Sequence, residues 1–300
     1  MKDLIGRIRT LKEERGAVIL VHNYQRPEIY RIADHIGDSF GLSKKASETG
    51  AEMIVFCGVD FMAECAHILS PGKTTLLPEI EARCPMAAMV SVEDMRKLKG
   101  KHPEAAVVSY VNTSAGVKAE SDICCTSSNA VKVVNSLDEK DVIFVPDHNL
   151  ANYVSRHTKK NIIPCKGWCY VHDKFSAGML RRSKGIHPDA EVVVHPECRP
   201  EVIDLADNIF STGGMLEHLK KSTSRKFIIG TEIGMIERLK MEFPGRTFLS
   251  APPANICLQM KKTTLNSVLE SLEKEQHRVT VPEDIRTRAK KALDRMLEVV

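Results

Sequence analysis

The chain has 300 residues, of which 43% are hydrophobic and 27% are charged, and its formal net charge is +4. This composition is ordinary for a globular protein, and no Lys/Arg cluster is interleaved with aromatic residues, so nucleic-acid binding is not expected. No apolar run approaches the roughly 20 residues that span a bilayer, and the N-terminal stretch lacks the apolar centre of a signal peptide. We therefore expect a cytoplasmic protein with no membrane partner.

The predicted elements begin with a helix over residues 1–16, in which Leu4, Ile8 and Leu11 share one face. Three similar segments follow, and each opens with a short apolar, β-branched run that is typical of a parallel strand covered on both faces. Each segment continues with a helical pattern, a short second strand, a third strand with its helix, and a fourth strand. The segments are bounded at 17–100, 101–185 and 186–262.

Repeats of this length predict an α/β protein built from three small units with parallel sheets. Right-handed crossovers place the loops after the strand ends at one edge of each sheet, where open α/β sheets bind ligands. If the three edges face one axis, these loops converge. A C-terminal helical segment, 263–300, is expected to pack on the first repeat and has one apolar face formed by Ile285, Ala289, Leu293 and Met296.

One cysteine follows the fourth strand of each segment. Cys84, Cys169 and Cys257 are separated by 85 and 88 residues. For a single cysteine, packing in the core is the simpler interpretation. Three at matching positions favour a metal site with three protein ligands and one open coordination position. Pro85 is a good first residue for a helix after Cys84, and the helix dipole is expected to favour the thiolate form of that cysteine.

Two kinds of metal centre remain open on this pattern. Three thiolates exclude Mg²⁺ and Ca²⁺ and leave zinc or an iron–sulfur cluster. Zinc usually takes a fourth ligand, for which His172, three residues after Cys169, is a candidate. A [4Fe–4S] cluster typically uses four cysteines, so three would leave one iron free to act as a Lewis acid on a substrate oxygen. The spacing alone does not decide between them.

Polar side chains also follow the first strand of each segment. They occur in the phrases His22-Asn23-Tyr24, Tyr110-Val111-Asn112 and His195-Pro196-Glu197. Imidazole, phenol, amide and carboxylate groups suit proton transfer and the binding of a small anion. Each alone could be a strand-end cap or a hydrogen-bonded core group. Their equivalent placement in three repeats instead predicts one shared site.

A hydroxyl residue precedes the helical pattern after each short second strand. Ser39, Ser127 and Thr212 occupy positions typical of helix N-caps. The same positions suit anion binding, because free backbone N–H groups and the helix dipole point outward there. Both roles can hold at once. Neither a GxGxxG nor a Walker sequence occurs, so a nucleotide cofactor is not expected.

Nine ordered blocks give the chain a family resemblance over essentially its full length. These blocks include CPMA, GWCYVH and STGGM. On them, the chain resembles the quinolinate synthases of de novo NAD synthesis, in their compact three-cysteine form. The blocks lie at 22–39, 58–64, 84–87, 110–113, 125–131, 167–172, 195–198, 211–215 and 229–235.

This resemblance implies an activity and a cofactor. Quinolinate synthases condense iminoaspartate (iminosuccinate) with dihydroxyacetone phosphate and release quinolinate, phosphate and water. It further implies three pseudo-equivalent αβα domains, each of three layers, around a central [4Fe–4S] cluster with pseudo-threefold symmetry. The cluster ligands would be Cys84, Cys169 and Cys257, and the open iron would act as a Lewis acid. An L-aspartate oxidase or dehydrogenase is the implied supplier of iminoaspartate.

The resemblance also implies roles for individual residues. The catalytic set is Tyr24, His22, Glu197 and His172, of which the first three are expected to move protons. The substrate-binding set is His22, Ser39, Tyr110, Val111, Asn112, Ser127, His195, Pro196, Glu197 and Thr212.

Three other functions fit part of the sequence. A different iron–sulfur hydro-lyase could use the same open iron on a small di- or tricarboxylate. A cluster-bearing redox sensor or scaffold would leave the three polar loops unexplained. A structural zinc protein would need no open position on its metal.

Overall fold

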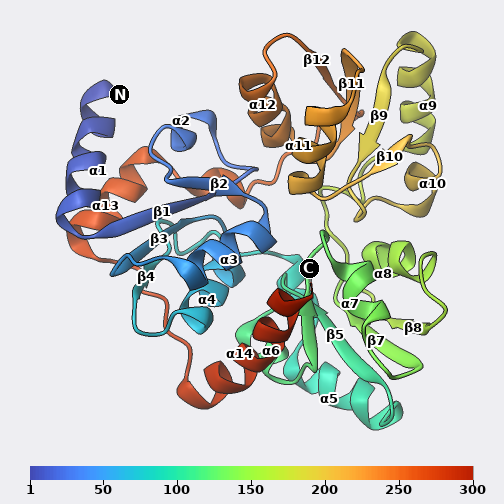
Figure 1. Ribbon diagram of the computed structural model, residues 1–300, viewed down its shortest axis with the longest axis horizontal. Helices are drawn as coiled ribbons and strands as arrows, with labels where there is room; N and C mark the ends of the chain where they lie inside the picture. The colour runs from blue at the N-terminus through green and yellow to red at the C-terminus, as the bar shows by residue number, and fades with distance from the viewer. Residues whose placement is uncertain (300) are drawn as a thin grey trace.

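The computed structural model describes residues 1–299 and contains three separate four-stranded sheets (Figure 1). All strand pairs within them are parallel, and the three strand orders are equivalent: β2-β1-β3-β4, β6-β5-β7-β8 and β10-β9-β11-β12. The first strand of each repeat is therefore central, as its continuous apolar run predicts. The strands are β1 Ala17–His22, β2 His35–Gly37, β3 Met53–Cys57, β4 Thr74–Leu76, β5 Ala106–Tyr110, β6 Ile123–Cys125, β7 Asp141–Val145, β8 Asn161–Pro164, β9 Glu191–Val194, β10 Asn208–Ile209, β11 Lys226–Gly230 and β12 Thr247–Ser250.

Helices cover both faces of each sheet, so the predicted α/β class is confirmed, with three similar αβα units. The helices are α1 Lys2–Glu14, α2 Pro27–Tyr30, α3 Ser39–Glu48, α4 Asp60–Leu69, α5 Val92–Lys101, α6 Ala115–Ala119, α7 Ala130–Asn135, α8 His148–Ser155, α9 Ala177–Ile186, α10 Pro200–Ile203, α11 Thr212–Lys221, α12 Ile233–Glu242, α13 Leu265–Lys274 and α14 Glu283–Glu298. Short 3₁₀ turns span Met86–Met89 and Met260–Lys262, just after two of the three repeated cysteines.

The repeat extends to single hydrogen bonds. In each unit an aspartate just before the short second strand accepts the backbone N–H of a residue in the central strand, 15 positions earlier. The three contacts are Ile19 N–H to Asp34 Oδ2 (2.8 Å), Val107 N–H to Asp122 Oδ2 (2.7 Å) and Val192 N–H to Asp207 Oδ2 (2.8 Å). The shared spacing indicates one local structure used three times. We call these residues the strand aspartates.

The C-terminal segment divides its packing between two units. Helix α13 lies against α1 and β3 of the first unit, where Val268 and Leu272 are fully buried. Helix α14 packs mainly on α6 and β6 of the second unit and only in part on α4 of the first (Figure 1). The expected packing on the first repeat therefore describes α13 but only part of α14. The predicted apolar face of α14 is confirmed, since Ala289, Leu293 and Met296 are buried.

In the part of the chain that the structure describes, no helix is long and apolar enough to cross a membrane.

Replacing Leu293 by Ala should lower the free energy of unfolding by about 2–5 kcal/mol, because it leaves a cavity where α14 meets two units. Chemical denaturation measures the change. Lys291→Ala is the matched control, since Lys291 lies in the same helix with its side chain exposed. Equal stabilities of the two variants would show that α14 does not depend on this apolar face.

Candidate active site

One cavity collects residues from the strand ends of all three units. Its wall contains the three repeated cysteines, Cys84, Cys169 and Cys257, together with polar residues from all three first-strand loops. The predicted site residues on this wall are His22, Tyr24, Ser39, Tyr110, Asn112, Ser127, His172, His195, Glu197 and Thr212. Val111 and Pro196 are buried but lie outside the lining, and Val111 packs in the apolar core.

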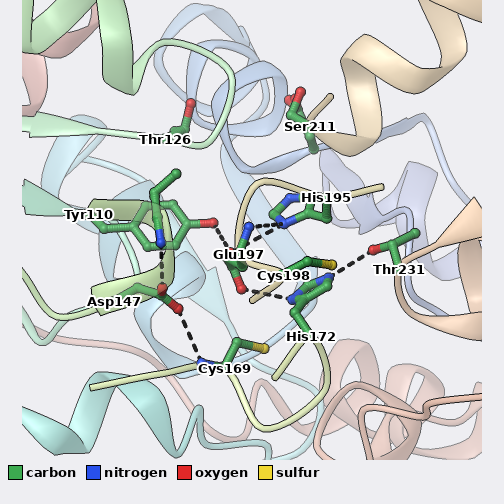
Figure 2. A network of polar contacts seen from close by, with 12 residues as sticks. Tyr110, Thr126, Asp147, Cys169, His172, His195, Glu197, Cys198, Ser211 and Thr231 are labelled. Carbon is green, nitrogen blue, oxygen red and sulfur yellow. Dashed lines mark hydrogen bonds and ion pairs between the residues drawn. The ribbon is translucent and has the colours of Figure 1, made fainter. Parts of the chain in front are cut away.

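A buried carboxylate occupies the centre of the site. Glu197 is 3% exposed; the Tyr110 hydroxyl donates to its Oε1, and His172 Nδ1 lies 2.9 Å from its Oε2 (Figure 2). Burial alone would raise the pKa of Glu197, but His172, His195 and these hydrogen bonds lower it to about 2. Glu197 is therefore ionised at neutral pH and accepts hydrogen bonds on both oxygens.

Two buried histidines near Glu197 are held neutral. Burial lowers the pKa of His22 to about 4, and burial together with neighbouring His172 lowers that of His195 to about 3. The rings of His172 and His195 stack with their centroids 4.4 Å apart. The Nδ1 atoms of His22 and His195 accept backbone N–H bonds from Tyr24 and Glu197, so each Nε2 carries the ring proton.

A chain of polar contacts leads from Tyr24 to Glu197. The Tyr24 hydroxyl lies 2.6 Å from Thr231 Oγ1 and 3.3 Å from His172 Nε2. Thr231 Oγ1 is in turn 2.9 Å from His172 Nε2, and the other ring nitrogen of His172 contacts Glu197. Burial, together with the Glu197 charge, raises the pKa of Tyr24 and of Tyr110 well above the ordinary value, so both phenols keep their protons.

The residues that cap the helices at this cavity are not the ones expected from the sequence but lie one or two positions away. Asp38 and Ser211 are the N-caps of α3 and α11, and their side chains accept N–H bonds from Gly41 and Gly214. Helix α7 starts after Asn129. A cap needs extended backbone and an oxygen facing the N–H three residues on, which Asp38 and Ser211 supply. Ser39, Ser127 and Thr212 therefore do not cap these helices.

The caps of α3 and α11 both contact Ser128 of the second unit, which lies just before the cap of α7. Ser128 Oγ donates to Asp38 Oδ2 (2.7 Å) and lies 2.9 Å from Ser211 Oγ. This contact joins the starts of α3, α7 and α11, whose free N–H groups favour an anion. Nearby, Asn112 Oδ1 is buried without a hydrogen-bond partner among the described residues, which leaves it available to a ligand donor.

The three cysteines line the cavity as partly buried thiols. Backbone N–H groups of Ala87, His172 and Met260, each three residues after its cysteine, interact with the sulfurs. Burial nevertheless raises the pKa of all three thiols. The expected stabilisation of the thiolate by a helix start is therefore outweighed by loss of solvent, and the thiolate form needs a bound cation.

The spacing of the thiols bears on the kind of metal. Among residues 1–299, one set of donors has all its ligand atoms within 4.8 Å of one another: Cys169, His172 and Glu197. Two sulfurs on one tetrahedral zinc lie about 3.8 Å apart. The three thiols do not form such a set, so their sulfurs do not all lie within 4.8 Å of one another.

Comparison with known proteins agrees with this site. The family described as "Quinolinate synthetase A protein" matches residues 6–298. The chain belongs to the quinolinate synthase family. Similar relatives are "Quinolinate synthase 1" of Methanosarcina acetivorans (56% identity; 99% of this chain, 98% of the relative), "Quinolinate synthase" of Methanoregula boonei (54%; 97% and 96%) and "Quinolinate synthase" of Geobacter sp. strain M21 (53%; 97% and 96%). Quinolinate synthases are enzymes of NAD biosynthesis.

Sequence reasoning missed three polar residues of this quinolinate synthase site. Thr231, Asp38 and Asp147 are brought there by folding, and none belongs to the phrases that follow the first strands. A signal existed for two of them, because Asp147 in VPD and Thr231 in GTE follow the third strands of their repeats. Comparison of those strand ends would have found them.

The two depressed histidine pKa values predict a titration result. His22 and His195 should show almost no change in ring chemical shifts between pH 5 and 8, since both stay almost entirely neutral there. In the unfolded chain each takes up a proton below about pH 6.5, so their contribution to stability is complete above that pH and declines as pH falls toward 4. NMR titration tests this, with His22→Gln and His195→Gln variants for assignment. A midpoint inside the window would contradict it.

Proposed function

We propose that this chain condenses iminoaspartate with dihydroxyacetone phosphate to quinolinate, phosphate and water. The main support is that three thiols and a buried carboxylate–imidazole–phenol network share one cavity. Family membership and identity above 50% over nearly the full chain support the same reaction. The chemistry requires an enzyme that forms iminoaspartate by oxidising L-aspartate, either an oxidase or a dehydrogenase.

A [4Fe–4S] cluster is the metal centre that we propose for the three thiols. One thiol from each unit reaches the same cavity, and the three sulfurs do not all lie within 4.8 Å of one another, which favours a cluster over a single ion. Cys84, Cys169 and Cys257 would hold it. When bound, the cluster supplies an open iron that acts as a Lewis acid toward a hydroxyl or carboxylate oxygen. A single ion bound by Cys169, His172 and Glu197 would instead leave the thiols of Cys84 and Cys257 without a role.

Proton transfer is assigned to the buried polar chain. Glu197 is ionised and is the base of the set, while Tyr24 keeps its proton and is the acid. Thr231 and His172 lie between them at hydrogen-bond distance and connect the phenol to the carboxylate. Neutral His22 and His195 donate from Nε2 toward the cavity and orient substrate oxygens.

The opposite part of the wall is suited to carboxylate and phosphate groups. Ser39 and Thr212 are the first residues of α3 and α11, so their hydroxyls and the nearby N–H groups can bind anionic oxygens. Ser127 and Asn112 add further polar groups from the second unit. Figure 2 shows this side, marked by Thr126 and Ser211, separated from Cys169 by the Glu197 network.

Metal analysis and product analysis test the proposal together. After anaerobic purification the chain should be brown, contain near-equal iron and sulfide, and form quinolinate only when both substrates are supplied. Cys84→Ala, Cys169→Ala and Cys257→Ala should each lose cluster and quinolinate formation.

Cys165→Ala is the matched control, because Cys165 is partly buried and only four residues from Cys169 but lies outside the cavity lining. A colourless protein that contains zinc, or dehydration of a small carboxylate without consumption of triose phosphate, would overturn the proposal.

Glu197→Gln should lower kcat for quinolinate formation by about 100-fold or more, because the amide is a poor base and its NH₂ cannot accept a hydrogen bond. Steady-state kinetics at saturating substrates measure the loss, with iron and sulfide content checked in the same sample. Full turnover of a cluster-loaded Glu197→Gln enzyme would remove Glu197 from the proton-transfer role.

A further inference from the structure

The helix that follows the third strand of each unit begins with a carboxyl side chain that contacts a cysteine loop. The backbone N–H of each repeated cysteine donates to this carboxyl group. The contacts are Cys84 N–H to Asp60 Oδ1 (3.0 Å), Cys169 N–H to Asp147 Oδ2 (3.1 Å) and Cys257 N–H to Glu232 Oε1 (3.1 Å). Figure 2 shows the second of these below the Glu197 network. We call the three acidic residues the loop carboxyls.

A second hydrogen bond joins the same two segments in every unit. The backbone N–H of the first residue of the helix donates to the carbonyl two positions before the cysteine. The contacts are Asp60 N–H to Ala82 O (2.9 Å), His148 N–H to Gly167 O (2.8 Å) and Ile233 N–H to Asn255 O (3.0 Å). Each cysteine loop is therefore held at two points, on either side of the residue that precedes its cysteine.

The attachment is shielded from water in two of the units. Asp147 and Glu232 are fully buried, and Glu232 also pairs with Lys261 at 3.0 Å. In the second unit the loop lies so close to the strand end that a Cβ on Gly167 would stand 2.6 Å from the Pro146 carbonyl oxygen. Buried hydrogen bonds without competing water fix a backbone position more firmly than exposed ones do.

Helix capping explains only part of this arrangement. Asp147 and Glu232 cap α8 and α12 by accepting the N–H of Leu150 and of Gly234. Asp60 accepts the N–H of Phe61. A cap needs no contact with a distant cysteine, yet all three residues make one, 22 to 25 positions along the chain. The recurrence in three units links the loop carboxyls to the thiols.

We propose that Asp60, Asp147 and Glu232 are positioning residues that hold the three cysteine loops in the arrangement that receives the metal centre. The inference rests on the proposed cluster but concerns a different property, namely how the chain presents its thiols. Groups one shell away from a metal ligand typically change metal affinity by about 10- to 100-fold when they are removed.

Asp60 gives the sharpest test, because one oxygen, Oδ1, accepts both the Phe61 and the Cys84 N–H groups, and the side chain is only partly buried. In Asp60→Asn the amide oxygen can keep both bonds, whereas Asp60→Ala loses them. The matched control is Asp34→Ala, which removes a strand aspartate of the same unit and its bond to Ile19 N–H. All variants are purified anaerobically as full-length chains and compared with the unsubstituted protein.

The measurements are iron and sulfide per chain, the rate of iron loss to a chelator, and the electron paramagnetic resonance spectrum after reduction. We expect Asp60→Ala to lose iron about 10-fold faster or more and to show an altered spectrum, while Asp60→Asn and Asp34→Ala resemble the unsubstituted protein. Equal iron loss from Asp60→Ala and the unsubstituted protein would overturn the inference. So would equal acceleration in Asp34→Ala, since that would reflect general destabilisation. If the unsubstituted chain itself binds no cluster, the proposed function fails instead.

Discussion

The carboxyl ends of parallel strands all lie at the same edge of a sheet, and the candidate site of this chain depends on that constraint. Three sheets of equivalent strand order direct these edges at one cavity. A short loop after any of these strands is therefore enough to reach the cavity. The first-strand loops bring imidazole, phenol, amide and carboxylate groups, the helix starts after the second strands bring hydroxyl groups, and the segments after the fourth strands bring thiols.

Bringing many polar groups into one closed space has an energetic cost that the site offsets by pairing. Glu197 stays charged because donors occupy both of its oxygens, while His22 and His195 stay neutral because the cost of burying a positive charge outweighs the attraction of nearby carboxylates. The two phenols and three thiols remain protonated because burial disfavours their negatively charged forms. The cavity wall thus combines the carboxyl groups of Glu197 and Asp38 with two neutral histidines, two protonated phenols and the three thiols.

The amino-acid sequence was sufficient for the fold class and for much of the cavity wall. Apolar strand runs and the even spacing of Cys84, Cys169 and Cys257 depend on periodicity, which is visible along the chain. Side-chain pairing between units is not visible in this way. Thr231 joins Tyr24 to His172 only after the first, second and third units have docked. The division of α14 between two units likewise follows from docking, because its apolar face would suit either of them.

The displacement of the helix caps by one residue has a consequence for protein design. Asp38 and Ser211 maintain helix geometry, whereas the adjoining Ser39 and Thr212 face the cavity. Helix capping and the lining of the cavity are consequently assigned to neighbouring positions, which can be varied separately. A library randomised at 39 and 212 alone could explore new anionic substrates on this scaffold while its helices stay intact.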